Sequence, residues 1–399
     1  MKNTWRFGEH ERRYIREVLD SGFGSSTSGS MNNRFENAFA EKVGARYAVT
    51  FNSGTSTLHA ALDAVGVNYG DEVITTPLTV ISNLDVILAQ NAVPIFADID
   101  AETFNIDPAQ VELKITEHTK AIMPVSLYGV SCDLEPLMRL GQKYGIAVIN
   151  DAAEAYGCHY NGRPIAQIAD ITSYSTENSK HITTGDGGIV VTNEADLAEK
   201  MRKFGSLGYA ALKASDGRIR SNKDIFQDPG YKRHDAFGYN YRMPEVAAAM
   251  GLAQTERLEK FLKLRSDIAE LYLTAVSKCD YLIPQKVPRD CNNTYWTVAM
   301  RYERDDISWQ DFRSQFIKFG GDGIYAAWAL LYQETVFASG AWKNRCPPLY
   351  GPIDYPLRGH CPIAEAVQPK IMQFVNNYGK VDEAKPFIDA LSKTIAYFK

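Results

Sequence analysis

The strongest constraint on the fold of this chain is an alternation, over about its first 250 residues, of short apolar runs with longer segments of helical periodicity. The apolar runs, rich in β-branched side chains, are RYAVTF (46–51), EVITTP (72–77), VPIFADID (93–100), AIMPVS (121–126), IAVIND (146–151) and GGIVVTN (187–193). Such runs are typical of strands buried on both faces, and strands separated by helices are typical of parallel sheets. The alternation therefore predicts an α/β domain with a largely parallel sheet between helices.

The pattern changes near residue 254. A long charged amphipathic helix is predicted at 255–278, followed by two strand candidates at 281–287 and 295–303 and by two C-terminal helices. We expect a large domain over 1–253 and a smaller α+β domain over 254–399. The polar segment 208–240, rich in glycine and aromatic residues, is too long for a plain connector, so we expect it to cover a site or to contact a partner.

Charge and composition exclude several classes of function. The net charge is −5 and long basic runs are absent, so we expect neither nucleic-acid binding nor a membrane-surface patch. The N-terminus lacks the apolar stretch of a signal peptide, and no run of about 18 apolar residues occurs, which favours a cytoplasmic protein. The cysteines form no CxxC pair, which favours reduced thiols over disulfides or a metal site. They are Cys132, Cys158, Cys279, Cys291, Cys346 and Cys361.

The first motif of chemical interest is FNSGTSTLHAAL (51–62), where a predicted strand meets a predicted helix. Gly54, followed by the small hydroxyl residues Thr55 and Ser56, opens the helix. Unpaired N–H groups and the helix dipole at such a position favour a phosphate. When the segment is considered alone, an ordinary helix cap is the more common explanation, because such caps are frequent.

The second motif is IAVINDAAEAYG (146–157), in which an apolar strand ends and presents Asp151 at its carboxyl end. Open α/β sheets have their ligand crevice at this edge. A carboxylate so close to the core needs a cationic or hydrogen-bonding partner, although an N-cap role is the alternative. Glu154, one helical turn later, could face the same crevice.

The third motif is STENSKHITTGDGG (175–188), which follows the strand candidate ITSYS (171–175). Lys180 lies five residues after Ser175 and before a glycine turn that lets the backbone approach a ligand closely. Most lysines are solvated surface charges. A lysine among small polar residues between two buried strands can instead lose its proton and attack a carbonyl group.

Together the three motifs predict a phosphate site, a strand-end carboxylate and a reactive lysine. Pyridoxal 5′-phosphate (PLP) uses all three, because its aldehyde binds a lysine, its ring nitrogen is kept protonated by an aspartate and its phosphate binds a helix N-terminus. The predicted cofactor is therefore PLP, and no metal is expected.

The chain resembles the DegT/DnrJ/EryC1/StrS family of sugar aminotransferases, within fold type I of the PLP enzymes. The resemblance covers nearly the whole chain and rests on four motifs in order. NSGTSTLHAAL resembles the family's N-G-T-x-A-L segment, and NDAAEAYG its E-D-A-A-Q-x-x-G. STENSKHITTGDGG resembles its S-F-x-x-x-K-x-x-x-x-G-E-G-G, and YNYRMPEVAAAMGLAQTERLE its N-Y-R-M-x-x-x-x-A-A-x-G-x-x-Q-L.

The resemblance implies a large domain with a mostly parallel seven-stranded sheet and a smaller α+β domain. It also implies residue roles. Lys180 would form the Schiff base, Asp151 would pair with the pyridinium nitrogen and Glu154 would contact the hydroxyl side of the ring. The phosphate ligands would be the amides of Gly54, Thr55 and Ser56, the hydroxyl of Ser175 and Asn240 of the neighbouring subunit, so that a homodimer would share its active sites.

Four positions depart from the family pattern. Glu154 stands where glutamine is common, and Thr176 replaces a phenylalanine. Val80 stands where an aromatic residue often stacks on the cofactor ring, so this contact becomes aliphatic. Ser126 stands where histidine is frequent, which bears on substrate contacts.

The resemblance implies transfer of an amino group, with glutamate as the expected donor, to the keto or aldehyde carbon of a sugar. Nucleotide-linked keto-hexoses, free keto-sugars, inositol-derived ketones and sugar acids all remain open. A dehydratase of the same fold would have histidine in place of the lysine; His181 is adjacent, but the spacing to the glycine turn assigns Lys180 to that position. A non-catalytic regulatory homologue is the other alternative. Basic residues of segment 208–240 could meet a phosphate or carboxylate, and they are Lys213, Arg218, Arg220, Lys223, Lys232, Arg233 and His234.

Overall fold

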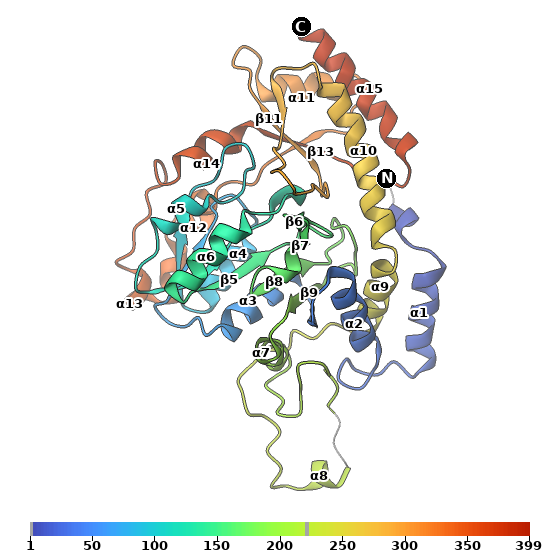
Figure 1. Ribbon diagram of the computed structural model, residues 1–399, viewed down its shortest axis with the longest axis vertical. Coiled ribbons are helices and arrows are strands. Elements are labelled where there is room, and N and C mark those ends of the chain that lie inside the picture. The colour runs from blue at the N-terminus through green and yellow to red at the C-terminus, as the bar shows by residue number, and fades with distance from the viewer. Residues whose placement is uncertain (1–2, 220–222) are drawn as a thin grey trace.

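The predicted strands lie side by side in one seven-stranded sheet of the computed structural model, which describes residues 3–219 and 223–399 (Figure 1). The order across the sheet is β1-β9-β8-β5-β4-β2-β3. The bounds are β1 Tyr47–Phe51, β2 Glu72–Thr75, β3 Val93–Phe96, β4 Thr119–Met123, β5 Ala147–Asp151, β8 Ile171–Ser175 and β9 Gly188–Thr192. Strand β9 is antiparallel to both of its neighbours, and the other pairs are parallel, so the mostly parallel sheet is confirmed.

Helices cover both faces of this sheet, because each strand sends alternate apolar side chains to either side. One face packs against α3 Gly54–Ala64, α4 Ser82–Ala89 and α7 Ala195–Gly205. The other packs against α2 Met31–Val43, α6 Leu134–Tyr144 and α9 Glu245–Thr255. The remaining elements of this part are η1 Asn3–Arg6, α1 Glu9–Asp20, α5 Pro108–Glu112, η2 Leu127–Gly129, β6 His159–Tyr160, β7 Arg163–Pro164 and η3 Ile165–Gln167.

A second, four-stranded sheet is antiparallel throughout and has the strand order β10-β11-β13-β12. Its strands are β10 Leu282–Pro284, β11 Val298–Tyr302, β12 Ile324–Ala326 and β13 Ile371–Phe374. It packs against the long helices α10 Leu258–Val276 and α15 Val381–Tyr397 and against α11 Trp309–Lys318 (Figure 1). The predicted long helix and two strand candidates are thus present, and the expected boundary at 253/254 stays a prediction.

The segment between β12 and β13 returns to the edge of the large sheet. It holds η4 Leu331–Gln333, α12 Thr335–Ala338, η5 Ala341–Arg345, α13 Pro347–Tyr350, α14 Pro362–Val367 and η6 Gln368–Lys370. The ring of Tyr332 lies 5.5 Å from that of Phe96 at the end of β3, centroid to centroid. The two sheets are therefore joined through a shared apolar cluster.

Segment 208–240, here called the projecting segment, extends away from the body beyond α7 and carries the short helix α8 Lys223–Gln227 (Figure 1). Phe237 in this segment is 99% exposed. Arg218 pairs with Asp216 at 2.9 Å, and His234 hydrogen-bonds the carbonyl oxygen of Leu207. Arg220, one of the predicted basic residues, lies outside the described residues.

Two further expectations concern cysteines and membranes. All six cysteines are free, and Cys132, Cys158 and Cys361 are buried. Among the described helices, none combines the length and the apolar character needed to cross a bilayer.

Candidate active site

The carboxyl ends of β1, β5 and β8 meet at one edge of the large sheet. In the register, Gly188 at the start of β9 pairs with Phe51 on one side and with Ser175 on the other. Asp151 at the end of β5 pairs with Ser173 of β8. The first two motifs and the strand end of the third, far apart in sequence, are therefore brought together where an open α/β sheet binds its ligands.

The N-terminus of α3 begins directly after β1. Ser53 is the N-cap, and its Oγ accepts a hydrogen bond from the amide of Ser56 at 3.0 Å. The amides of Gly54 and Thr55 belong to the first turn, where no intrahelical acceptor exists, and within the described ranges they have no other protein acceptor. Two free N–H groups at the positive end of the helix dipole favour an anion.

Close packing explains why glycine stands at residue 54. A Cβ atom built there would lie 2.9 Å from the Cβ of Ser175. The absence of a side chain lets the helix start approach the end of β8, so that the Ser175 hydroxyl and the free amides face the same space.

Asp151 is buried, with 3% of its surface exposed. Burial raises the pKa of its carboxyl group, and the amide of Ala153 and the charge of Lys180 oppose this shift. Its Oδ1 accepts a hydrogen bond from the amide of Ala153 at 3.1 Å. A carboxylate held in this way is available to a cationic group of a ligand.

Lys180 lies in the turn between β8 and β9, and its side chain is 12% exposed. Its Nζ donates to Glu154 Oε1 at 3.2 Å and lies 4.3 Å from the centroid of the Trp296 ring. Burial raises the pKa of Glu154, while Lys180 and the amide of Tyr128 act in the opposite direction. The amine is therefore held between one carboxylate and one aromatic face.

These groups surround a cavity of about 460 Å³, which is within the usual range for small-molecule sites. Six predicted cofactor residues line it, namely Gly54, Thr55, Val80, Asp151, Ser175 and Lys180. Ser56 and Glu154 are buried beside it, and the Ser56 amide is already bonded to Ser53. Asn240 is exposed on the projecting segment, where it pairs with Ser206 outside this cavity.

Sequence reasoning missed the aromatic wall of the cavity. Trp296 and Trp328 line it from the small-sheet side, with ring centroids 6.0 Å apart and an interplanar angle of 22°. Tyr128 stacks on both indole rings at 6.3 Å. The tryptophans follow no period that marks a site, so their rarity in the sequence was the only available signal.

Two positions considered with the motifs lie away from the cavity lining. His181 is buried, and its Nε2 hydrogen-bonds the carbonyl oxygen of Thr294 at 2.9 Å. Burial and the nearby Arg265 lower the pKa of His181. Ser126 is buried and donates to Asn150 Oδ1. Both side chains therefore have structural contacts.

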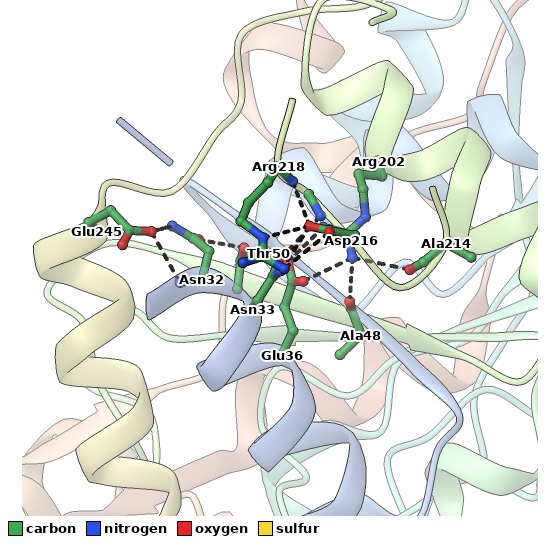
Figure 2. A network of polar contacts seen from close by, with 11 residues as sticks. Asn32, Asn33, Glu36, Ala48, Thr50, Arg202, Ala214, Asp216, Arg218 and Glu245 are labelled. Carbon is green, nitrogen blue, oxygen red and sulfur yellow. Dashed lines mark hydrogen bonds and ion pairs between the residues drawn. The ribbon is translucent and has the colours of Figure 1, made fainter. Parts of the chain in front are cut away.

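A buried polar network fixes the root of the projecting segment to the large sheet (Figure 2). Arg202 of α7 forms two hydrogen bonds with Glu36 of α2, at 2.9 and 3.0 Å. The same guanidinium donates to the carbonyl oxygens of Ala48 in β1 and Ala214 in the projecting segment. The segment that carries Asn240 is thus anchored beside β1.

Comparison with known proteins agrees with this geometry. The model of the DegT/DnrJ/EryC1/StrS aminotransferase family matches residues 6–347. The GDP-perosamine synthase of Escherichia coli O157:H7 is 39% identical over 290 residues, which cover 73% of this chain and 74% of that protein. The spore coat polysaccharide biosynthesis protein SpsC of Bacillus subtilis (strain 168) is 39% identical over 299 residues, or 74% of each chain.

Solved structures share the whole fold. An aminotransferase from Psychrobacter cryohalolentis superposes with a TM-score of 0.84 at 29% identity, and the match covers 98% of both chains. DesV of S. venezuelae, solved in complex with a ketimine intermediate, superposes with a TM-score of 0.81 at 26% identity over 96% of this chain and 94% of that one. The fold expected from the four motifs is therefore confirmed.

Proposed function

This chain belongs to the DegT/DnrJ/EryC1/StrS aminotransferase family, and we propose that, as a sugar aminotransferase, it transfers an amino group from glutamate to the keto or aldehyde carbon of a nucleotide-linked sugar, with PLP as cofactor. The observation that carries the proposal is one cavity lined by Lys180, Asp151 and the start of α3. The names of the relatives, a GDP-perosamine synthase and a spore coat polysaccharide biosynthesis protein, support a sugar substrate. The product would be an amino sugar for a polysaccharide, a lipopolysaccharide or a secondary metabolite.

The residues of the cavity fit this cofactor. The amides of Gly54 and Thr55 and the hydroxyl of Ser175 offer donors for a phosphate where a side chain at residue 54 would block the approach. The buried carboxylate of Asp151 suits a protonated ring nitrogen, and the amine of Lys180 suits an aldehyde. Val80, 38% exposed, offers an aliphatic surface to a ring.

When bound, PLP supplies an aldehyde that condenses with amines and a pyridinium ring that accepts the electron pair of the donor's α-carbon. Asp151 would keep the proton on the ring nitrogen, because its buried carboxylate would pair with that cationic group. Lys180 Nζ would act as the general base that takes the proton from the donor's α-carbon, and it would then donate that proton to the cofactor carbon that retains the amino group. Glu154 Oε1 orients this amine.

We also propose a homodimer with shared sites. Asn240 belongs to the projecting segment, which extends from the body (Figure 1). The nearby side chain of Phe237 is almost fully exposed. Apolar side chains exposed to this degree are typical of interaction surfaces when they gather in one place, and Leu207 and Tyr239 are also exposed there. A second copy of the chain would bury them and receive Asn240 at its phosphate site.

The dehydratase alternative is disfavoured by the surroundings of the two adjacent residues. Lys180 lines the cavity, whereas His181 is buried against Thr294 and Tyr156. A reaction that uses the amine is therefore the better match.

The proposal is tested by loading the protein with PLP, reducing it with borohydride and mapping the modified lysine by mass spectrometry. We expect the label on Lys180, and we expect Lys180→Ala to lose both label and turnover while the exposed-lysine control Lys143→Ala keeps both. Glutamate and glutamine are then compared as donors with GDP-, UDP- and dTDP-linked keto-sugars, and products are identified by mass. A label on another lysine, or turnover in Lys180→Ala, would contradict the proposal.

A further inference from the structure

The turn that carries Lys180 has no regular secondary structure of its own, because residues 176–187 connect β8 to β9 without a helix or strand. Backbone carbonyl groups in such a turn need donors from elsewhere. Four consecutive carbonyl oxygens, those of residues 178–181, accept hydrogen bonds from side chains more than 80 positions away in the chain. The conformation of the lysine is therefore decided by distant segments.

The first of these segments is the N-terminal helix η1. Arg6 Nη1 donates to the carbonyl oxygen of Asn178 at 2.6 Å. Arg6 Nη2 donates to the carbonyl oxygens of Lys180 at 2.6 Å and His181 at 3.0 Å. The Arg6 side chain is fully buried, and it holds the peptide unit that follows the lysine together with the carbonyl groups of Asn178 and His181.

The second segment is α10. Arg265 Nη2 donates to the carbonyl oxygens of Ser179 at 3.0 Å and Lys180 at 3.4 Å. Its Nη1 donates to the carbonyl oxygen of Trp296 at 2.6 Å and to Asn376 Oδ1 at 3.1 Å. The indole Nε1 of Trp296 also donates to the Ser179 carbonyl oxygen. Arg265 thus links the turn of residues 176–187 to Trp296, whose ring faces the amine of Lys180.

The hydrogen-bond acceptors of both guanidinium groups are carbonyl and amide oxygens, not carboxylates. Burial lowers the pKa of Arg6 to about 10 and that of Arg265 to about 9. Burying a cation away from a carboxylate is costly, and a turn that needed only shape could be held by neutral donors. Two arginines here are therefore an unusual choice for a purely structural contact.

We propose that Arg6 and Arg265 are positioning residues for Lys180, which hold the peptide groups on both sides of the lysine so that its amine stays aimed into the cavity. This inference rests on the proposed role of Lys180. A guanidinium group suits the task, because its planar fork can bind several carbonyl oxygens at fixed angles. A small misplacement of a reacting group lowers the rate by up to about 10²-fold. Arg6 and Arg265 therefore affect turnover through the position of the Lys180 amine and not through contact with the substrate.

Hydrogen bonds to its backbone hold Arg6 in place. The carbonyl oxygen of Arg6 accepts hydrogen bonds from Gln254 Nε2 at 2.8 Å and from Arg257 Nη2 at 2.5 Å. Both donors lie at the junction of α9 and α10, close in sequence to Arg265. Arg6 is therefore held by the junction that leads into α10, the helix that carries Arg265.

The test compares Arg6→Met, Arg265→Met and the conservative Arg6→Lys with a control, Arg16→Met, which removes an exposed arginine of α1. We expect kcat to fall about ten- to hundredfold in both methionine variants, with KM for the sugar changed less than about threefold, because the lost interaction acts after binding. Arg6→Lys should recover part of kcat. Amide hydrogen exchange in peptides covering 176–187 should be at least tenfold faster in Arg6→Met than in Arg16→Met.

The inference is overturned if Arg6→Met and Arg265→Met retain the kcat of Arg16→Met, or if exchange in 176–187 is unchanged. If a methionine variant does not fold, Arg6→Gln decides, because its side-chain amide can donate to no more than two of the three carbonyl oxygens. A folded glutamine variant with wild-type kcat and wild-type exchange overturns the inference as well. Borohydride mapping on the same samples separates the two proposals. A label away from Lys180 would refute the proposed role of that lysine, whereas faster exchange in 176–187 would still establish that the arginines hold the turn.

Discussion

Removal of the Arg202 guanidinium should cost far more stability than removal of an ordinary surface charge. Arg202 and Glu36 are 5% and 3% exposed, and they form a bidentate ion pair at the root of the projecting segment (Figure 2). In Arg202→Met the carboxylate of Glu36 stays buried, and among the described residues only the amide and hydroxyl of Thr50 would still donate to it. Breaking one side of a buried pair typically costs about 3–5 kcal/mol, since the remaining charge is left uncompensated.

This loss can be expressed as a change in melting temperature. An unfolding entropy of about 2.1 cal/mol/K per residue gives about 0.8 kcal/mol/K for a chain of 399 residues. A loss of about 3–5 kcal/mol therefore corresponds to a Tm about 4–6 °C lower. We would measure it by calorimetry on cofactor-free protein, so that ligand binding does not add to the stability.

Two controls isolate the charge effect. Arg218→Met removes the guanidinium of a partly exposed pair with Asp216 and should cost less than about 1 kcal/mol. The double variant Glu36→Leu/Arg202→Met removes both buried charges and should recover most of the loss, because apolar replacement of a whole buried pair is often close to neutral. A single variant within about 1 kcal/mol of the wild type, or a double variant no better than the single one, would refute the reasoning.

Four other perturbations test the site and its surroundings. Asp151→Asn should still bind PLP but lower kcat by about 10²-fold or more, because the ring nitrogen loses its anionic partner; a near wild-type rate would assign that task to another group. Gly54→Ala should weaken PLP binding at least about tenfold, because the new methyl group would lie 2.9 Å from the Cβ of Ser175, and unchanged affinity in a fluorescence titration would argue against the phosphate site. Asn240→Ala should weaken PLP retention by about 1–3 kcal/mol, and mixing it with Lys180→Ala should restore activity in mixed dimers; continued inactivity despite measured subunit exchange would exclude a shared site. Burial, and to a lesser extent the charge of Arg345, lowers the pKa of His59 from 6.5 to about 4. Between these two pH values the unfolded state binds a proton at His59 that the folded state does not, so stability falls as the pH drops from 6.5 toward 4. Between pH 7 and pH 5 the wild type should lose about 2 kcal/mol more than His59→Asn in urea unfolding, and equal losses would mean that His59 is protonated in the folded protein.

Much of the fold could be predicted from the sequence, because the strands of the large sheet are buried on both faces. IAVIND becomes β5, which ends at Asp151, and GGIVVTN becomes β9, whose first residue is Gly188. Most strands of this kind carry apolar side chains on both faces over most of their length, so the pattern can be recognised in the local sequence. The short strands β12 and β13 were not predicted, since each has three or four residues and depends on partners far away in the chain.

The residues of the candidate site could likewise be predicted only in part from the sequence. Gly54 and Asp151 could be proposed from the sequence because one starts a helix and the other ends a strand. Lys180 could be proposed because it lies between a strand end and a glycine turn. The fold brings all three into one cavity. The Ser56 amide, which the family resemblance assigns to the phosphate, donates to Ser53 Oγ here, because an N-cap side chain accepts from the amide two or three residues further on.

Only the tertiary structure decided which residues hold the backbone around Lys180. Arg6 at one end of the chain and Arg265 and Trp296 in its second half converge on the carbonyl groups around Lys180. No periodicity or motif links these residues, because a hydrogen bond to a backbone carbonyl group requires no particular residue type at the acceptor position. The sequence by itself determined which strands and which reactive groups this chain has. Packing of distant segments decided how its amine is held, since only the folded chain brings their donors within 3.5 Å of that turn.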